Sequence, residues 1–200
     1  MSDELAASTD RFRSLVGAPA KLLRGLLITS TVLGSLWALE IHNYFEVTFF
    51  KQQYLALFLA LALGAVFLAV KAYPKQSGEF VPWYDWLLAL CGFAIGLYVT
   101  VMYPTIAYRL GVLSPDRWIL GGLALILVLE ATRRVAGGTL AWLALAVILY
   151  TKFAEFLPGI LYSKSPSWAR IVSYLYLDSN GMLGLPIDVA AGVVVAFILF

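Results

Sequence analysis

The chain has 200 residues, of which 62% are hydrophobic and 13% are charged, and its formal net charge is +2. Soluble domains usually carry about 25% charged residues, so this composition favours a membrane protein. The small net charge gives no indication of nucleic-acid binding, and the single cysteine, Cys91, excludes an internal disulfide and a CxxC metal or redox site.

A polar tail precedes the first apolar segment. Residues 1–21 are mixed in charge, and the apolar run that follows leads into Glu40 without a small-x-small cleavage site. This pattern predicts a cytoplasmic tail and an uncleaved first span, Leu22–Leu39, rather than a signal peptide. Ser30 and Gly34, followed by Ala38, form a stripe of small residues, which is typical of close helix packing in membranes.

The second predicted span, Gln53–Ala72, contains the most apolar stretch of the chain. Its 17 residues from Tyr54 to Val70 hold six Leu, two Phe and two Val and no acidic or basic side chain. On the insertion scale these ten residues favour the bilayer by about 3–6 kcal/mol. A helix at the surface of a soluble core would need a polar face, which this segment lacks.

The third predicted span, Trp83–Met102, carries a GxxxG motif formed by Gly92 and Gly96. Such a motif lets two helix backbones approach closely and gain van der Waals contact. The sequence leaves open whether the second helix belongs to this chain or to a partner subunit.

The fourth and fifth predicted spans are Trp118–Arg133 and Gly138–Phe156. Their charge-free cores, residues 118–129 and 139–151, are short for a full crossing of about 20 residues. Tilted, protein-surrounded or partly re-entrant helices are therefore alternatives, and we favour two separate crossings.

Glu130, Arg133 and Arg134 interrupt apolar sequence. On a helix Glu130 faces Arg133 at i+3 and Arg134 at i+4, in the order that favours ion pairs. Each charge would cost about 2.5–3.5 kcal/mol at the bilayer centre. We interpret them as a helix end locked by a salt bridge on the cytoplasmic side, with Gly137-Gly138 breaking the helix. An intramembrane ion or substrate site is the alternative.

The segment Leu157–Gly181 is polar except for one short amphipathic stretch. Ser165-Pro166 has the residue types of a helix start, with Ser as cap and Pro at the first helical position. Four apolar residues then share one face: Trp168, Ile171, Val172 and Leu175. They predict a short helix that lies either in the membrane interface or against the protein itself.

A last span is predicted to start near Gly184, after a turn at residues 178–181. Gly184 and Pro186 open it, and Asp188 in its first turn suits the N-terminal helix dipole, with an ion site as the alternative role. Residues 189–200 are too few to cross a bilayer. We therefore expect this sequence to be the front part of a longer polypeptide.

The distribution of basic residues predicts which side the N-terminus occupies. With the N-terminus inside, eight basic residues fall on the cytoplasmic side: Arg11, Arg13, Lys21, Arg24, Lys71, Lys75, Arg133 and Arg134. Six fall on the other side: Lys51, Arg109, Arg117, Lys152, Lys164 and Arg170. The bias favours a cytoplasmic N-terminus.

No catalytic constellation is present in the sequence. There is no nucleophile–base pair, phosphate-binding loop or pair of carboxylates, so we expect neither an enzyme nor a cofactor. The only histidine, His42, lies beside Glu40 and Glu46, where a solvated loop residue is favoured over a metal ligand. One histidine also argues against bis-histidine haem ligation.

Several landmarks together resemble the fused permeases of TRAP transporters of the TAXI type. They are Tyr103-Pro104-x4-Arg109-x-Gly111, Leu129-Glu130-Ala131-Thr132-Arg133-Arg134-x2-Gly137, Leu157-Pro158-Gly159 and Gly181-x2-Gly184-x-Pro186. In such permeases a four-helix small subunit is joined to a twelve-helix large subunit that holds the ion and substrate sites. The resemblance covers nearly the whole chain after the tail.

The resemblance implies a fold, a location and a function. It implies an all-α polytopic bundle of five to six transmembrane helices plus a short interfacial helix, in a bacterial or archaeal cytoplasmic membrane. Residues 22–135 would form the small-subunit-like domain, 136–180 the fifth span and periplasmic linker, and 181–200 the start of the large domain. The implied function is a scaffold within a sodium-coupled secondary transporter that imports organic acids delivered by a periplasmic TAXI-type binding protein.

A function of another class fits the same residues. An accessory or assembly membrane protein would use the same tight helix packing and have no transport pathway of its own.

Overall fold

The computed structural model describes residues 11–41, 50–73, 80–109, 114–159, 162–194 and 197, without the side chains of residues 193 and 194. Within these residues the protein is built from helices, and one isolated antiparallel β-bridge joins Phe12 to Val70. The predicted all-α fold is confirmed. His42 and Lys75 lie outside the described residues.

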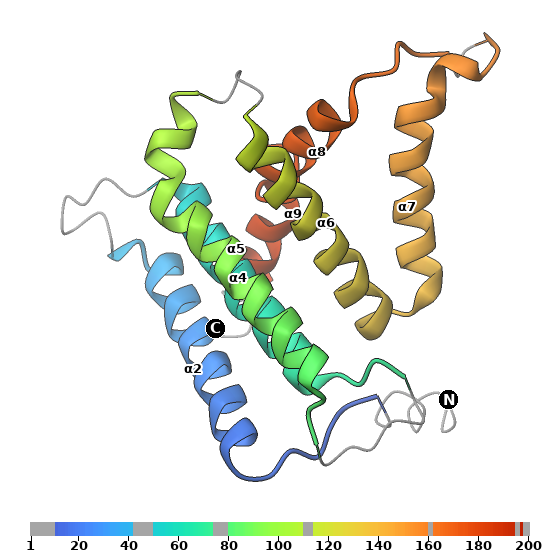
Figure 1. Ribbon diagram of the computed structural model, residues 1–200. Coiled ribbons are helices and arrows are strands. Elements are labelled where there is room, and N and C mark those ends of the chain that lie inside the picture. The colour runs from blue at the N-terminus through green and yellow to red at the C-terminus, as the bar shows by residue number, and fades with distance from the viewer. Residues whose placement is uncertain are drawn as a thin grey trace.

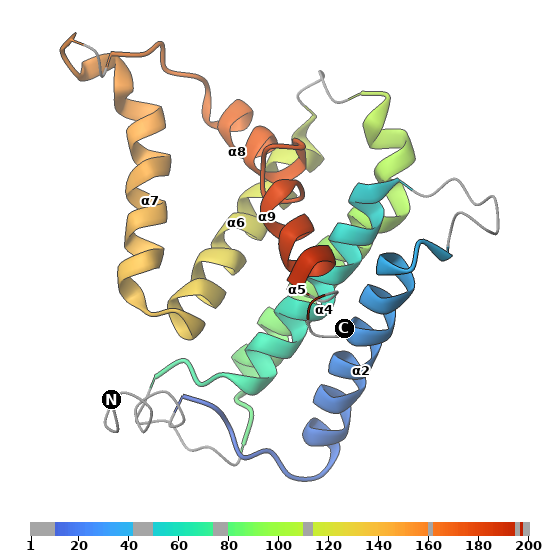
Figure 2. The same cartoon turned by 180° about the vertical axis from the view of Figure 1, so that it is seen from behind.

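The helices follow the predicted order along the chain. They are α2 (Ala18–Ala38), α4 (Lys51–Ala69), α5 (Trp83–Ala107), α6 (Pro115–Val135), α7 (Gly138–Phe153) with the 3₁₀ turn η1 (Ala154–Phe156), α8 (Trp168–Leu177), α9 (Leu185–Asp188) and the π-helical turn η3 (Val189–Val194). From α2 to α7 the long helices run alternately up and down (Figure 1). Helix α4 lies between α2 and α5, and α7 stands apart from them on the far side of α6 (Figures 1 and 2).

Three helical segments in the described part are long and apolar enough to cross a membrane: Lys51–Ala69, Trp83–Ala107 and Gly138–Phe156. Helices α2 and α6 also form at the predicted positions, and each has 21 residues. They are less apolar, because α2 includes Lys21 and Arg24 and α6 has charged residues in both its first and last turns.

The GxxxG motif joins two helices of the same chain. A Cβ atom on Gly96 would lie 2.5 Å from the Ala60 Cβ and 2.7 Å from the Ala56 carbonyl oxygen, and one on Gly92 would lie 2.9 Å from the Leu63 Cβ. The absence of side chains at both positions therefore allows α5 to lie directly on α4. This resolves the choice between an internal and an external partner for this motif.

The small residues of α2 lie on a helix that packs against α4 and η3. Gly34 is buried, and the Ser30 hydroxyl donates a hydrogen bond to the Leu26 carbonyl one turn earlier (2.8 Å). The Leu26 side chain in turn reaches Gly64 of α4.

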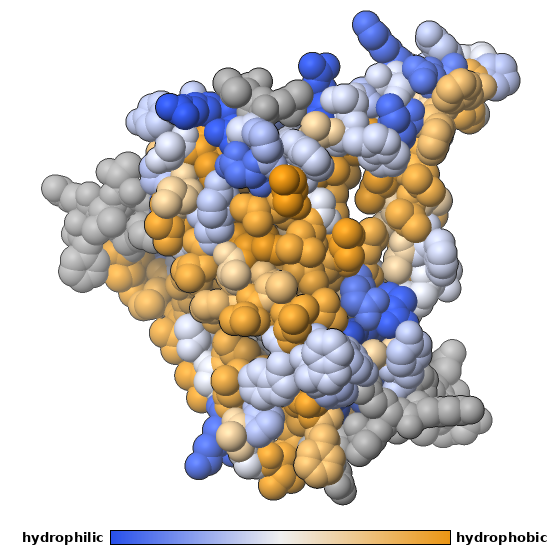
Figure 3. Space-filling model, viewed as in Figure 1, coloured by the Kyte–Doolittle hydropathy of each residue, from blue (hydrophilic) through white to orange (hydrophobic). Residues whose placement is uncertain are grey.

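The segment from Trp118 to Phe156 forms two separate helices. Gly137 has φ +98°, a left-handed conformation that strongly favours glycine, and the next residue is the first of α7. The break predicted at Gly137-Gly138 is present. No residue of α7 itself is buried, and its surface is apolar (Figure 3).

Helix α8 begins two residues later than predicted. Ser167, and not Ser165, is the cap, and its side chain accepts from the Arg170 N–H. The Ser165 hydroxyl instead donates to the Lys152 carbonyl at the end of α7 (2.6 Å) and accepts from the Lys152 ammonium group (3.2 Å), so it is held there and does not cap α8. Helix α8 packs on α6, where a Cβ on Gly121 would lie 3.0 Å from Val172 and 3.1 Å from Tyr176.

The C-terminal segment turns back into the bundle. A Cβ on Gly184 would lie 1.8 Å from the Ser179 carbonyl oxygen, so only glycine fits this turn. Pro186 lies in the first turn of α9, where its missing N–H has no helical partner to lose. Behind it, the Tyr54 hydroxyl donates to the Ala191 carbonyl (2.7 Å), and the C-terminal turns lie beside α4 in Figure 2.

Candidate functional site

Five charged side chains meet where α4 ends, α5 begins and α6 ends. We call them the ionic network: Arg13, Asp85, Glu130, Arg133 and Arg134. They come from three regions far apart in sequence: the N-terminal segment, the first turn of α5 and the C-terminal end of α6. The network is the largest group of interacting charges in the described part of the chain.

Asp85 is the centre of this network. Its side chain is completely buried, and its two oxygens face two guanidinium groups. Oδ2 pairs with Nη2 of Arg13, and Oδ1 lies 2.7 Å from Nη1 of Arg134. Both arginine side chains are also buried, with exposed fractions of 0% and 2%. Removing one partner from such a pair leaves an uncompensated buried charge and typically costs about 3–5 kcal/mol.

Glu130 holds the outer part of the network. Arg133 binds it through Nε and Nη2, both at 2.7 Å, and Arg134 binds it through Nε at 2.8 Å. The salt bridge predicted at i+3 and i+4 is therefore present. Arg134 spans both acids and so fastens the end of α6 to the start of α5.

The N-terminal segment completes the end of α4. The last four carbonyl groups of this helix have no donors within it, a serious cost in an apolar environment. All four are satisfied: Arg13 Nη1 donates to Phe67 (2.9 Å) and Leu68 (3.1 Å), the Arg13 backbone N–H donates to Ala69 (2.8 Å), and the Val70 N–H donates to Val66 (2.8 Å). Residues 11–13 are thus part of the folded bundle and more than a tail.

The arginines at the end of α6 extend this arrangement. Nη1 of Arg134 donates to the Val70 carbonyl (3.4 Å), and Nη2 of Arg133 donates to the Ala72 carbonyl (3.3 Å). Arginine remains protonated at any accessible pH, so these contacts are suited to holding helices in place and unsuited to transferring protons. The network therefore connects four segments: the N-terminal segment, the end of α4, the start of α5 and the end of α6.

Sequence reasoning missed two members of the network. Arg13 was predicted only as a basic residue of the cytoplasmic tail, and Asp85 was not singled out. A signal for Asp85 did exist, because it is an acid in the first turn of an apolar helix. Its partners could not be read from sequence, since the Arg13–Asp85 pair is separated by 72 positions.

A second polar contact lies inside the α4–α5 pair. Pro104 has no N–H, so the Thr100 carbonyl one turn earlier lacks its usual donor. The side-chain amide of Gln53 donates to this carbonyl (2.6 Å), and its oxygen accepts from the Phe50 N–H at the start of α4 (3.0 Å). One buried glutamine therefore provides the missing donor in α5 and an acceptor at the start of α4.

The opposite end of the bundle carries weaker and more exposed contacts. Lys51 at the start of α4 pairs with Asp188 of α9 (2.7 Å), so the predicted Asp188 is engaged in an ion pair between helices. Asp116 accepts a hydrogen bond from the Tyr98 hydroxyl (2.7 Å), which lowers the pKa of this carboxyl below its usual value.

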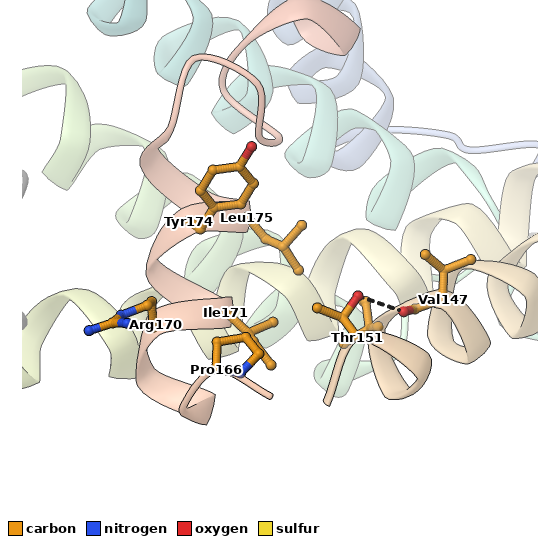
Figure 4. A pocket seen from close by; sticks show the side chains of 8 residues that line it. Val147, Thr151, Pro166, Arg170, Ile171, Tyr174 and Leu175 are labelled. Atoms are coloured by element: carbon orange, nitrogen blue, oxygen red, sulfur yellow. Dashed lines mark hydrogen bonds between the residues drawn. The ribbon is translucent and has the colours of Figure 1, made fainter. Parts of the chain in front are cut away.

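An apolar groove lies between α7 and α8 (Figure 4). It has a volume of about 310 Å³, and Val147 and Thr151 of α7 face Ile171 and Pro166 across it. The Thr151 hydroxyl donates back to the Val147 carbonyl (3.0 Å), which leaves the groove almost without polar groups. It is suited to an apolar occupant such as a side chain or an acyl chain.

Among the residues that the structure describes, no group of three or more His, Cys, Asp or Glu side chains is arranged to hold a metal ion. No family model matches this sequence, and neither the curated proteins nor the solved structures contain a match.

Proposed function

We propose that this chain is the membrane scaffold portion of a secondary active permease of the TRAP type. In this proposal it resides in the cytoplasmic membrane of a bacterium or archaeon, with its N-terminus in the cytoplasm. It braces a moving transport domain and helps form the docking surface for a periplasmic binding protein that delivers organic acids. A sodium gradient drives the import.

The main support for the proposal is that the buried charged side chains connect the helices to one another. Arg13, Asp85 and Arg134 bind one another and the carbonyl groups at the end of α4. A scaffold needs such fixed connections, because a part that braces a moving domain must itself keep its shape.

The landmarks that resemble the permease family occupy constrained positions, which lends further support. Glu130 and the two arginines after it belong to the ionic network, and Gly137 and Gly159 have φ +98° and +70°. Gly184 lies where any side chain would collide with the Ser179 backbone. A motif with a structural role at each position is less readily matched by chance than one of exchangeable residues.

The surface of α7 supports the scaffold role in a different way. This helix is apolar (Figure 3) and carries no buried residue, although its first turns line one pocket with Arg133 and Arg134. Lipid or a further membrane domain is the natural neighbour for such a surface.

Reconstitution into proteoliposomes tests the proposal. The complete permease, isolated with its transport domain, is compared with residues 1–200 alone, each with and without the binding protein and an inward sodium gradient. We expect gradient-dependent uptake of radiolabelled organic acids by the complete permease only. Sodium-dependent uptake by residues 1–200 would overturn the scaffold role. If the complete protein is stable in the vesicles but takes up no organic acid, the alternative of an accessory membrane protein without a transport pathway would be favoured.

A further inference from the structure

A polar pocket of about 340 Å³ adjoins the ionic network at the junction of α6 and α7. Its walls come from the N-terminal segment, the chain after α4, the end of α6 and the start of α7. The residues that carry its chemistry are Arg11, Lys71, Tyr73, Arg133, Arg134 and Trp142.

Positive charge exceeds negative charge in this region. The pocket and the network together bring five cations, Arg11, Arg13, Lys71, Arg133 and Arg134, against two carboxylates, those of Asp85 and Glu130, among the described residues. Neither Asp85 nor Glu130 lines the pocket, whereas four of the five cations do. An anion is therefore the favoured occupant.

The geometry of the cations suits a phosphate group. Arg11 is fixed by a bond from Nη1 to the Val135 carbonyl (3.3 Å), and its backbone oxygen accepts from the Lys71 N–H (2.9 Å). Arg133 uses Nε and Nη2 to bind Glu130, and its guanidinium is stacked 5.3 Å from the centre of the Tyr73 ring. Nη1 of Arg133 and Nη2 of Arg11 take part in none of these bonds, and arginine groups held in this way can bind phosphate oxygens with little further loss of conformational entropy.

The surroundings of the pocket favour a lipid over a soluble phosphate. Trp142 of α7 is 70% exposed and Tyr73 is 64% exposed, and amphipathic aromatic rings of this kind favour the headgroup region of a membrane. Beyond Trp142 the exposed apolar side chains of α7 continue with Leu143 and Val147. In Figure 3 a hydrophilic patch lies beside the base of α7, with hydrophobic surface above it.

We propose that this pocket binds the phosphate headgroup of an anionic phospholipid, whose acyl chains lie along the apolar surface of α7. Basic pockets beside transmembrane helices are suited to such headgroups. The bound lipid would hold α7 in its position beside the bundle. This site does not depend on transport, so it stands or falls separately from the proposed permease function.

Lipid titration of the purified protein in a neutral detergent tests the proposal. The probes are phosphatidylglycerol, phosphatidylcholine and the water-soluble glycerol phosphate, and binding is measured by native mass spectrometry and by the shift in unfolding temperature. We expect tight binding of phosphatidylglycerol alone. Equal binding of phosphatidylcholine would overturn a charge-selective site, and equal binding of glycerol phosphate would replace the lipid with a soluble anion.

A paired substitution locates the site. Arg11→Gln with Lys71→Gln removes two pocket cations that are not members of the ionic network. About 30-fold weaker phosphatidylglycerol binding is expected, because each cation near an anionic lipid contributes about fivefold. The matched control is Lys164→Gln with Arg170→Gln, two exposed cations, one just before α8 and one in its first turn. An unchanged unfolding temperature in phosphatidylcholine shows that the variant folds. Equal losses in both variants would mean that the lipid responds only to net charge, which would overturn the site.

Discussion

Single buried residues determine how the helices of this protein are connected. Asp85 pairs with an arginine from each of two distant segments, and Gln53 provides the donor that Pro104 withholds from Thr100. In both cases a buried polar side chain connects two or more segments: Asp85 through ion pairs with Arg13 and Arg134, and Gln53 through hydrogen bonds to α5 and to the start of α4. Such sites are sensitive to the loss of one member, because the groups left behind remain buried.

The first prediction concerns Asp85→Asn. The change keeps the shape of the side chain but leaves two buried guanidinium groups without a full countercharge, so we expect unfolding to become easier by about 3–5 kcal/mol. Unfolding in detergent, followed by circular dichroism, measures this. Asp116→Asn is the matched control, since Asp116 is an exposed acid in the first turn of α6. A comparable loss of stability in this control would contradict the claim that burial makes the Asp85 substitution costly.

The second prediction is a double-mutant cycle at the α4–α5 contact. Gln53→Leu leaves the Thr100 carbonyl without its donor and should cost about 1–3 kcal/mol. Pro104→Ala restores an N–H in the helix, so the same Gln53→Leu change should cost clearly less in that background. Stability is measured by thermal unfolding. Equal costs in both backgrounds would show that the hydrogen bond from Gln53 to the Thr100 carbonyl does not account for the stabilising effect of Gln53.

At the scale of whole elements, glycine positions decide which helices lie together. The α4–α5 pair is the most extensive contact, and it depends on Gly92 and Gly96. Because lipid gives helices no hydrophobic reason to associate, close backbone approach provides the main gain.

The third prediction follows from this pair. Gly96→Ala places a Cβ 2.5 Å from that of Ala60, against backbone that cannot move aside, and should cost about 1–3 kcal/mol in unfolding free energy. Gly122→Ala in α6 is the control, since a Cβ there meets nothing within 4 Å. At that position the better helix propensity of alanine should leave stability unchanged or raise it slightly.

The sequence predicted the elements better than their contacts. Apolar runs located α2 and α4 to α7, and the i+3 and i+4 spacing located the Glu130 pairs, because both signals are local. The predicted cap of α8 was wrong by two residues, since Ser165 is bound to Lys152 of α7, a contact that no local sequence signal indicates. Asp85 and Arg13 were missed for the same reason: their pairing depends on how α5, α6 and the N-terminal segment meet.

At the scale of the whole molecule, the basic residues are divided between the two ends. Arg11, Arg13, Lys71, Arg133 and Arg134 gather at one end, whereas Lys51 and Lys152 lie with α8 and α9 at the other. The alternation of the long helices produces this division (Figure 1). It provides a direct test of orientation.

The fourth prediction concerns that orientation. In a Cys91→Ala background, which removes the only cysteine, Tyr73→Cys and Lys164→Cys place exposed thiols at opposite ends. With a cytoplasmic N-terminus, an impermeant maleimide added to intact cells should label position 164 and spare position 73. The reverse pattern would place the ionic network outside, and labelling at both positions after membrane rupture serves as the control.

The Arg13–Asp85 bond has a consequence for biosynthesis. Arg13 leaves the ribosome 72 residues before its carboxylate partner, and Arg134 emerges later still. Arg13 is already synthesised when α4 forms, so it can satisfy the carbonyl groups at that helix end while its own guanidinium group still lacks the Asp85 countercharge. Until α5 has been delivered, this cation must be balanced by water, lipid headgroups or the insertion machinery.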